Sequence, residues 1–340
     1  MSGVSHYPAV VIDPLFADGP DAMVELCERF GRYGMYSQEH VESDIGLGLG
    51  QRHDSVLNFI KTGGRFGRHE DLKTLARRTN YFREEYAYGQ RTLIDGIEPY
   101  LNHRAFAEAA IAVHGRPIVE PAIVFANLMV PGQELATHTD VPEFRGANRK
   151  VMPQWLLVAM HHSGLFEPWR MPIATGVAWF HDCDGGEFAY YPDGADGPPV
   201  AHQVHSNTAL VFDADSVFHG VDRIASTVDD MPPLKPGMHL TFAGDGQWVV
   251  RAEDDATEVV RYRWDELRFS ISWKAYCFAD ERERDTWRAG GDDLSIDVVL
   301  NRLIDNLRAV GRITGPLPAK TELALMIIDE YIVFPAPELV

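Results

Sequence analysis

Apolar positions recur at helical spacing through the first third of the chain. The spacing predicts helices over residues 21–34, 70–88 and 90–114. Asp21 stands where a helix N-cap is expected, and Pro99 is expected to interrupt the third helix. This part of the chain is therefore expected to be mostly helical.

The pattern changes near residue 116. From there to residue 278 the sequence consists of short β-branched and aromatic runs separated by Gly, Pro and Asp, which predicts an all-β barrel or sandwich. The expected strands include the run QWLLVAMHH at 154–162. Helical spacing returns around 280–310, whereas the final run, TELALMIIDEYIVF, leaves helix and strand open.

No linker-like stretch separates these parts, so we expect one domain. Its segments are an N-terminal helical support (1–115), a β-rich core (116–278) and a C-terminal helical region (279–340). The predicted fold class is mainly β with flanking helices.

Composition and charge restrict the partners. The chain has 31 Lys and Arg against 50 Asp and Glu, giving a formal net charge of −19 over 340 residues. Such a charge repels a phosphate backbone, so we expect no nucleic acid partner. No apolar run reaches the ~20 residues of a membrane span, and the first residues are not typical of a signal peptide, so we expect no membrane association.

The three cysteines, Cys27, Cys183 and Cys277, are scattered and form no Cys-x-x-Cys pair. This spacing predicts neither a disulfide framework nor a thiolate zinc site, and it is typical of a reducing compartment. We therefore expect a cytoplasmic protein that handles a small molecule or a protein partner. The sequence leaves its oligomeric state open.

Candidate metal ligands lie in the segments ATHTD and SVFHG. His138 and Asp140 are two residues apart in a stretch typical of a strand or strand end, so both side chains are expected on one side. His219 follows an apolar run, where a β-barrel would bring it opposite the pair. Two imidazoles and a carboxylate leave about three coordination positions of an ion open, an arrangement associated with non-haem Fe(II) oxygenases. A His-x-Asp pair alone is a weak signal, because polar surface residues often produce it.

The order of four segments resembles the Fe(II)- and 2-oxoglutarate-dependent dioxygenases, most of all the prolyl-4-hydroxylase-like branch. These segments are ANLMVPGQELATHTD, WFHDCDGGEFAYYPDG, NTALVFDADSVFHGVDRI and RFSISW, and they cover about residues 118–278. The resemblance implies a double-stranded β-helix core of the jelly-roll or cupin-like kind. It also implies Fe(II) as cofactor, 2-oxoglutarate as co-substrate and O2.

Individual residues match the motifs of that family. The resemblance implies that His138, Asp140 and His219 are the iron ligands. It further implies that Arg268 pairs with the distal carboxylate of 2-oxoglutarate and that Ser270 supplies a hydroxyl beside it. A guanidinium suits this role because it meets a carboxylate in a bidentate fashion and stays charged in a partly buried pocket.

The sequence departs from the family pattern at two places. Met129 stands where relatives often carry a Tyr that hydrogen-bonds the co-substrate, so Asn127 or another residue would have to supply this bond. An insertion at 224–264, expected to be an acidic hairpin, lengthens the connection to the last strand. The longer connection makes Arg223 a rival for the role given to Arg268, although Arg223 lies close to the preceding ligand.

Substrate-side candidates come from segments expected near the pocket. They are Arg145, Trp155, His161 and Arg223. Each is also explained by ordinary surface or loop polarity or by core packing.

The predicted function is hydroxylation of an unactivated C–H bond of a small molecule, such as an amino acid or a natural-product intermediate. The same chemistry on a peptide or protein side chain, or with a desaturation or cyclisation outcome, remains an alternative. A zinc hydrolase would also suit two His and one carboxylate but gives Arg268 and Ser270 no role. A catalytically silent β-helix binding protein would leave the three ligands unexplained.

Overall fold

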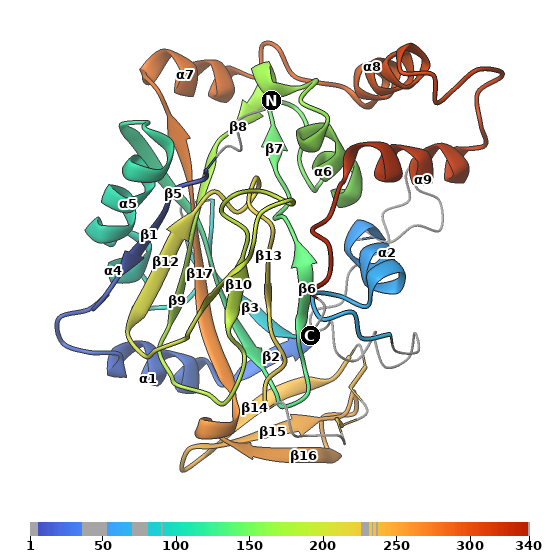
Figure 1. Ribbon diagram of the computed structural model, residues 1–340. Helices are drawn as coiled ribbons and strands as arrows, with labels where there is room; N and C mark the ends of the chain where they lie inside the picture. Colours follow the sequence, from blue (N-terminus) through green and yellow to red (C-terminus); the bar gives the residue numbers. More distant parts are fainter. Residues whose placement is uncertain are drawn as a thin grey trace.

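The computed structural model describes residues 6–35, 53–69, 81–89, 91–225, 231–232, 234–235 and 237–338. Within these ranges the protein is mainly β, with helices arranged around the sheets, which confirms the predicted fold class (Figure 1).

The larger sheet is antiparallel and has one central strand that is paired along nearly its whole length. In spatial order its strands are β1 (Ala9–Ile12), β12 (Thr208–Phe212), β9 (Ile173–Trp179), β17 (Arg268–Phe278), β5 (Ile118–Met129), β3 (Phe82–Tyr88), β2 (Arg32–Met35), β14 (His239–Gly244), β15 (Gln247–Arg251) and β16 (Glu258–Arg263), and β4 (Arg91–Thr92) pairs with β3. β17 pairs with β5 on one side and with β9 on the other. Side chains on β17 are therefore held on a rigid support.

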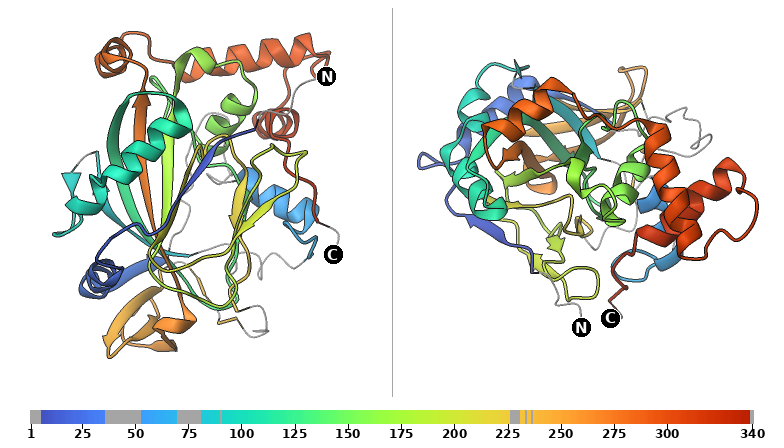
Figure 2. Two further views of the ribbon diagram at one scale, coloured as in Figure 1. Left: turned by 60° about the vertical axis from the view of Figure 1, so that its left-hand side comes forward. Right: turned by 90° about the horizontal axis from the view of Figure 1, so that it is seen from above.

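A smaller antiparallel sheet packs against one face of the larger one (Figure 2). Its strands are β11 (Val200–His202), β10 (Phe188–Tyr190), β13 (His219–Val221) and β6 (Leu135–His138), and a separate short pair joins β7 (Glu143–Phe144) to β8 (Arg170–Met171). Trp179 and Phe212 of the larger sheet meet Phe188 and Val221 of the smaller sheet in one buried cluster. This face-to-face packing is the double-stranded β-helix that the family resemblance implies for the core.

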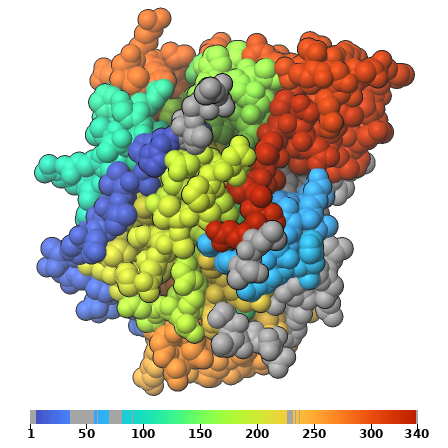
Figure 3. Space-filling view, in the orientation of Figure 1, coloured from blue at the N-terminus to red at the C-terminus, as the bar shows by residue number. Residues whose placement is uncertain are grey.

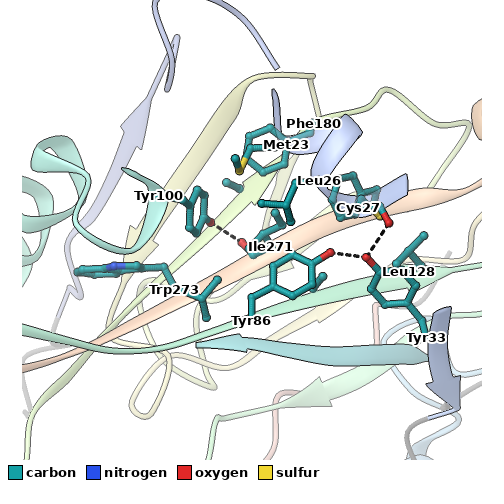
Figure 4. Close-up of a cluster of buried hydrophobic side chains, with 14 of the residues drawn as sticks. Met23, Leu26, Cys27, Tyr33, Tyr86, Tyr100, Leu128, Phe180, Ile271 and Trp273 are labelled. Atoms are coloured by element: carbon teal, nitrogen blue, oxygen red, sulfur yellow. Dashed lines mark hydrogen bonds between the residues drawn. The ribbon is translucent and has the colours of Figure 1, made fainter. Parts of the chain in front are cut away.

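The other face of the larger sheet is covered by helices from the N-terminal part. These are α1 (Asp21–Phe30), α4 (Glu98–Leu101) and α5 (Arg104–His114). The ring of Phe106 on α5 stacks on Trp273 of β17 with centroids 5.1 Å apart, and the hydroxyl of Tyr100 donates to the carbonyl of Ile271 at 2.8 Å (Figure 4). Gly176 on β9 makes room for this stack, because a Cβ atom there would lie 2.9 Å from the Phe106 ring.

Residues 154–162 form helix α6 (Gln154–His162), so the strand predicted there is wrong. Residues Gln154 to Met160 are all buried, and the helix packs in a second apolar cluster with α8 (Ile296–Ala309) and α9 (Lys320–Tyr331). A run that is apolar on every side has no period, so its sequence cannot distinguish a buried helix from a buried strand.

The N-terminal segment contains strands as well as helices, so the expectation of a mostly helical first third is corrected. Residues 82–88 form β3 in the larger sheet instead of the end of a helix, and residues 70–80 of that prediction lie outside the described residues. Hydrophobic residues of β3, such as Phe82 and Tyr86, are buried against the central sheet. Pairing with β5 makes this segment a strand, since tertiary context overrides a weak local propensity for helix.

The ends of the N-terminal helices also differ from expectation. α1 ends at Phe30, because Gly31 takes a left-handed conformation with φ of 70° and directs the chain into β2. The Asp21 side chain makes no capping hydrogen bond, and Pro20 occupies the N-cap position. Pro99 lies in the first turn of α4, where a missing N–H is tolerated, rather than inside a longer helix.

The insertion at 224–264 adds three strands to the larger sheet. The predicted hairpin corresponds to β14 and β15, which pair with each other. β16 pairs with the free side of β15, and β14 pairs with β2 from the N-terminal part. The part of this segment that precedes β14 is described only in part.

The C-terminal part begins with α7 (Glu281–Ala289), continues through α8 and α9, and then runs along α2 (His53–Thr62) and the segment that follows it (Figure 3). The run that left helix and strand open is therefore mostly helix α9. The backbone N–H of Glu338 donates to the carbonyl of Arg65 at 2.7 Å, and its carboxylate pairs with the same arginine at 3.2 Å.

Two short 3-10 helices, η1 (Glu167–Trp169) and η2 (Trp264–Glu266), complete the elements that the structure describes. In the parts of the chain that are described, every helix is too short or too polar to cross a membrane.

Phe106→Ala should lower the free energy of unfolding by about 3–5 kcal/mol, because it leaves a cavity beside Trp273 in a fully buried cluster. Urea unfolding monitored by circular dichroism measures this loss. Ile111→Ala on the same helix is the matched control, since Ile111 is exposed and should change the free energy by less than about 1 kcal/mol. Equal losses in the two variants would contradict the assigned role of the stack.

Candidate metal centre and anion pocket

Two neighbouring strands of the smaller sheet bring the three candidate metal ligands together. His138 is the last residue of β6 and His219 is the first residue of β13, and the antiparallel register places them directly opposite each other. Asp140 follows two residues after β6, where its backbone N–H donates to the carbonyl of Ala214 at 2.7 Å. This hydrogen bond fixes the turn that carries the carboxylate to the two imidazoles.

The ligand atoms face one another. Oδ1 of Asp140 lies 3.8 Å from Nε2 of His138 and 3.8 Å from Nε2 of His219, and the imidazole centroids are 4.5 Å apart. All three atoms lie within 4.8 Å of one another, and no other group of His, Cys, Asp and Glu in the described chain converges in this way.

Backbone carbonyls orient both imidazoles. Nδ1 of His138 lies 2.7 Å from the carbonyl of Ala136, and Nδ1 of His219 lies 2.9 Å from the carbonyl of Val217. A carbonyl only accepts, so these partners assign the proton to Nδ1 and leave the Nε2 lone pair directed toward Asp140. This is the tautomer that a metal ligand requires.

Lys274 of β17 completes the surroundings of the carboxylate. Its Nζ donates to Oδ2 of Asp140 at 2.6 Å and to Oγ1 of Thr175 at 3.2 Å. Burial alone would raise the pKa of Asp140, but the positive charge of Lys274 and the hydrogen bond that it donates hold this pKa well below its usual value. The carboxylate is therefore ionised at neutral pH, as a ligand must be.

The residues fit a divalent cation. The donor set is two imidazole nitrogens and one carboxylate oxygen on one side of a common point, with both tautomers prepared for ligation. Fe(II) suits this set, with positions left open for other ligands, and Zn²⁺ suits it as well.

Arg268 forms a second feature of the interior. It is the first residue of β17, is only 2% exposed, and donates from Nε to the carbonyl of Gly186 at 2.9 Å and from Nη1 to Oγ of Ser270 at 3.3 Å. Its Nη2 has no hydrogen-bond partner among the described residues. Burial lowers the pKa of its guanidinium to about 10, so the group is still charged at neutral pH. A buried guanidinium with an unpartnered donor fits an anionic ligand.

A glycine turn and the Ser270 hydroxyl adjoin this guanidinium, and Asn127 lies across from Ser270 on the neighbouring strand. Gly186 has a φ of 70°, and a Cβ atom there would lie 2.9 Å from Cδ of Arg268, so the turn leaves room that only glycine allows. Asn127 lies opposite Ser270 in the register of β5 and β17, and its Oδ1 is buried with no partner among the described residues. Met129 lies opposite Arg268 and is buried in the cluster between the sheets.

Two further arginines that the sequence offered as candidates, Arg223 and Arg145, each bond a carboxylate of the protein. Arg223 donates from Nε to Glu134 at 3.3 Å, so this guanidinium already has a carboxylate beside it. Arg145 forms a two-pronged bond to Asp292 with both distances 2.8 Å.

Helix α6 positions the remaining two candidates. Trp155 is fully buried in the cluster of the C-terminal helices. Nε2 of His161 lies 3.0 Å from Oγ of Ser216, and burial together with the charge of Arg170 lowers its pKa to about 3. Substrate-side roles for these residues stay predictions.

Sequence analysis missed Lys274 and a polar cluster behind Asp140. Lys274 follows Arg268 by six residues on the same face of β17, and this even spacing is the signal that could have revealed it. In the polar cluster, Arg170 donates to Asp213 at 2.7 Å, whereas both carboxylate oxygens of the fully buried Asp215 are without a partner among the described residues. Burial raises the pKa of Asp215 to about 8.

Comparison with known proteins gives distant structural likenesses only. No family model matches the chain, and no curated protein matches its sequence. Similar solved structures include HygX from Streptomyces hygroscopicus with nickel, 2-oxoglutarate and hygromycin B bound, with 10% identity, 80% of this chain and 84% of that chain covered, and a TM-score of 0.38. A Pseudomonas putida prolyl-4-hydroxylase has 14% identity, coverage of 76% and 98%, and a TM-score of 0.31.

A further similar structure is an oxidoreductase of the 2OG-Fe(II) oxygenase family from Burkholderia pseudomallei, with 13% identity, coverage of 71% and 96%, and a TM-score of 0.32. The Burkholderia protein is named as a 2OG-Fe(II) oxygenase, and HygX carries nickel and 2-oxoglutarate.

Asp215→Asn should stabilise the metal-free protein by a margin that grows with pH. The folded pKa of about 8 lies above the ordinary value of 3.8, so the folded state binds an additional proton between these pH values. The free energy of unfolding therefore falls as the pH rises through this window, by up to about 1.4 kcal/mol per pH unit. The amide of the variant does not titrate, so the variant does not show this fall. Urea unfolding at several pH values between about 4 and 8 measures the margin. Asp305→Asn on α8 is the exposed control, and a margin for Asp215→Asn that does not change with pH would contradict the prediction.

Proposed function

We propose that the protein is an Fe(II)- and 2-oxoglutarate-dependent oxygenase of the dioxygenase superfamily, in the prolyl-4-hydroxylase-like branch that its motifs resemble. One observation carries the proposal: the same interior holds a convergent His, Asp and His group and a buried arginine whose Nη2 has no partner in the described part of the chain. A zinc hydrolase would use the three ligands but has no use for a buried anion-binding arginine.

The three ligands would hold Fe(II) through Nε2 of His138, Nε2 of His219 and Oδ1 of Asp140. When bound, Fe(II) supplies the redox chemistry and the open coordination positions for co-substrate and O2. The contribution of the protein is to orient these groups on a rigid sheet and to exclude water from them.

Arg268 would receive the distal carboxylate of 2-oxoglutarate through its free Nη2, with Ser270 beside it. The unpartnered Oδ1 of Asn127 is an acceptor on the same face of the sheet and would bind a donor, for example an ordered water beside the co-substrate. Trp179 and Phe188 line the neighbouring wall, so the carboxylate would lie in a largely dry pocket in which a charge-assisted bond is strong.

The substrate that we propose is a small molecule, such as an amino acid or a natural-product intermediate, and the outcome is hydroxylation of an unactivated C–H bond. A peptide or protein side chain, and desaturation or cyclisation, remain the alternatives. A nucleic acid substrate is disfavoured by the net charge of −19, and we place the protein in the cytoplasm because of its scattered cysteines.

Asp140→Ala should abolish both Fe(II) binding at this site and the conversion of 2-oxoglutarate to succinate, because it removes the only anionic ligand of the three. Anaerobic titration with Fe(II) and measurement of succinate, with mass spectrometry of candidate substrates for a 16 Da gain, test this. Asp305→Ala on α8 removes an exposed carboxylate and should leave both properties unchanged. Full turnover in Asp140→Ala would show that the site assignment is wrong.

Arg268→Ala should raise the 2-oxoglutarate requirement by about 30-fold or more while leaving Fe(II) binding nearly unchanged. The loss corresponds to about 2–5 kcal/mol for a buried charge-assisted contact whose partner stays unpaired. Arg223→Ala is the matched control, because that guanidinium already faces Glu134 and should have little effect. Titration of both variants with 2-oxoglutarate decides between them, and a larger defect in Arg223→Ala would reverse the assignment.

A further inference from the structure

Lys274 binds the oxygen of Asp140 that the imidazoles do not face. Nζ of Lys274 lies 2.6 Å from Oδ2, whereas Oδ1 lies 3.8 Å from Nε2 of each histidine. The two carboxylate oxygens therefore have different partners before any cation is bound.

The position of Lys274 is fixed by the sheet. Its backbone pairs with Ile123 of β5 and with Thr175 of β9, and the hydroxyl of Thr175 takes the second hydrogen bond from Nζ at 3.2 Å. The side chain is 15% exposed, so little water competes for the ammonium group. The buried carboxyl of Asp215 also lies close enough to interact electrostatically with this ammonium, yet the hydrogen bond is made to Asp140.

Two consequences follow for a cation held by the three ligands. A carboxylate with both oxygens available can bind a cation through one or two of them, and Lys274 leaves only Oδ1 for this purpose. The ammonium also offsets the negative charge of Asp140, so the ligand set is close to neutral and a divalent cation keeps nearly its full charge. Both effects favour an additional ligand that is anionic and chelating.

We propose that Lys274 is a positioning residue that restricts Asp140 to one ligating oxygen and neutralises its charge, and thereby reserves coordination positions and positive charge for a dianionic chelator. This inference rests on the proposed metal site, and it goes beyond the proposed function by assigning a role to a residue outside the ligand set.

Lys274→Met tests the proposal, because Met keeps the length of the side chain and removes the ammonium. Co(II) is the probe for the metal site, and oxalate is the dianionic chelator, since it lacks the distal carboxylate that Arg268 would bind. Isothermal titration calorimetry measures Co(II) binding to the metal-free protein and then oxalate binding to the Co(II)-loaded protein. The variant should bind Co(II) at least as tightly as wild type and should bind oxalate about ten-fold more weakly or worse.

Matched variants separate this role from a merely structural one. Lys274→Arg keeps the charge and should retain most of the oxalate affinity, and Thr175→Val removes only the second hydrogen bond and should have a smaller effect. Lys61→Met, on the exposed surface of α2, controls for the loss of one positive charge and should leave both affinities unchanged. Far-ultraviolet circular dichroism checks that each variant is folded.

The outcomes are distinct. Weaker Co(II) binding by folded Lys274→Met, or unchanged oxalate affinity, would overturn the role proposed for Lys274. Failure of the wild-type protein to bind Co(II) would instead overturn the metal site and the proposed function with it. Oxalate binding without 2-oxoglutarate binding would leave the role of Lys274 intact and contradict only the co-substrate assignment.

Discussion

The two faces of strand β17 carry opposite chemistry, and the candidate site depends on that separation. Phe269, Ile271 and Trp273 point into the apolar core beneath the N-terminal helices. The alternate residues, including Arg268 and Lys274, line the interior between the two sheets. Because β17 is bonded on both sides, packing on the outer face also fixes the polar residues of the inner face.

The buried charges of the interior are compensated unequally. Asp140 has an ammonium at hydrogen-bond distance, so its charge is neutralised within the protein. Arg268 has only a carbonyl and a hydroxyl as partners, and its remaining donor is unpaired among the described residues. An unpaired buried charge is unfavourable in the folded protein. An anion that binds Arg268 would remove this unfavourable term, so the imbalance favours ligand binding.

Segments far apart in the chain complete the support of the site. β1, β2 and β3 from the N-terminal part join the larger sheet, and the 224–264 insertion extends it beyond β2. Helix α6 is held between the β-helix core and the C-terminal helices, and its His161 contacts Ser216 close to Asp213. This arrangement links the segment that follows Asp140 to the segment that precedes His219.

Local periodicity alone determined part of this protein. The alternation along Arg268–Lys274 sets which side chains share a face, because a strand repeats every two residues wherever it lies. Asp140 lies outside β6, and its carboxylate reaches His138 through the turn that the hydrogen bond to Ala214 fixes. The sequence predicted the β-rich core, and the structure brings together the three candidate ligands that the family resemblance implied, His138, Asp140 and His219. Tertiary packing decided what has no local period: the apolar run 155–160 became the buried middle of helix α6, and residues 82–88 became β3 through pairing with β5. It also decided the partner of Lys274, since Asp140 lies 134 residues earlier and only the closure of the two sheets brings an ammonium and that carboxylate into contact.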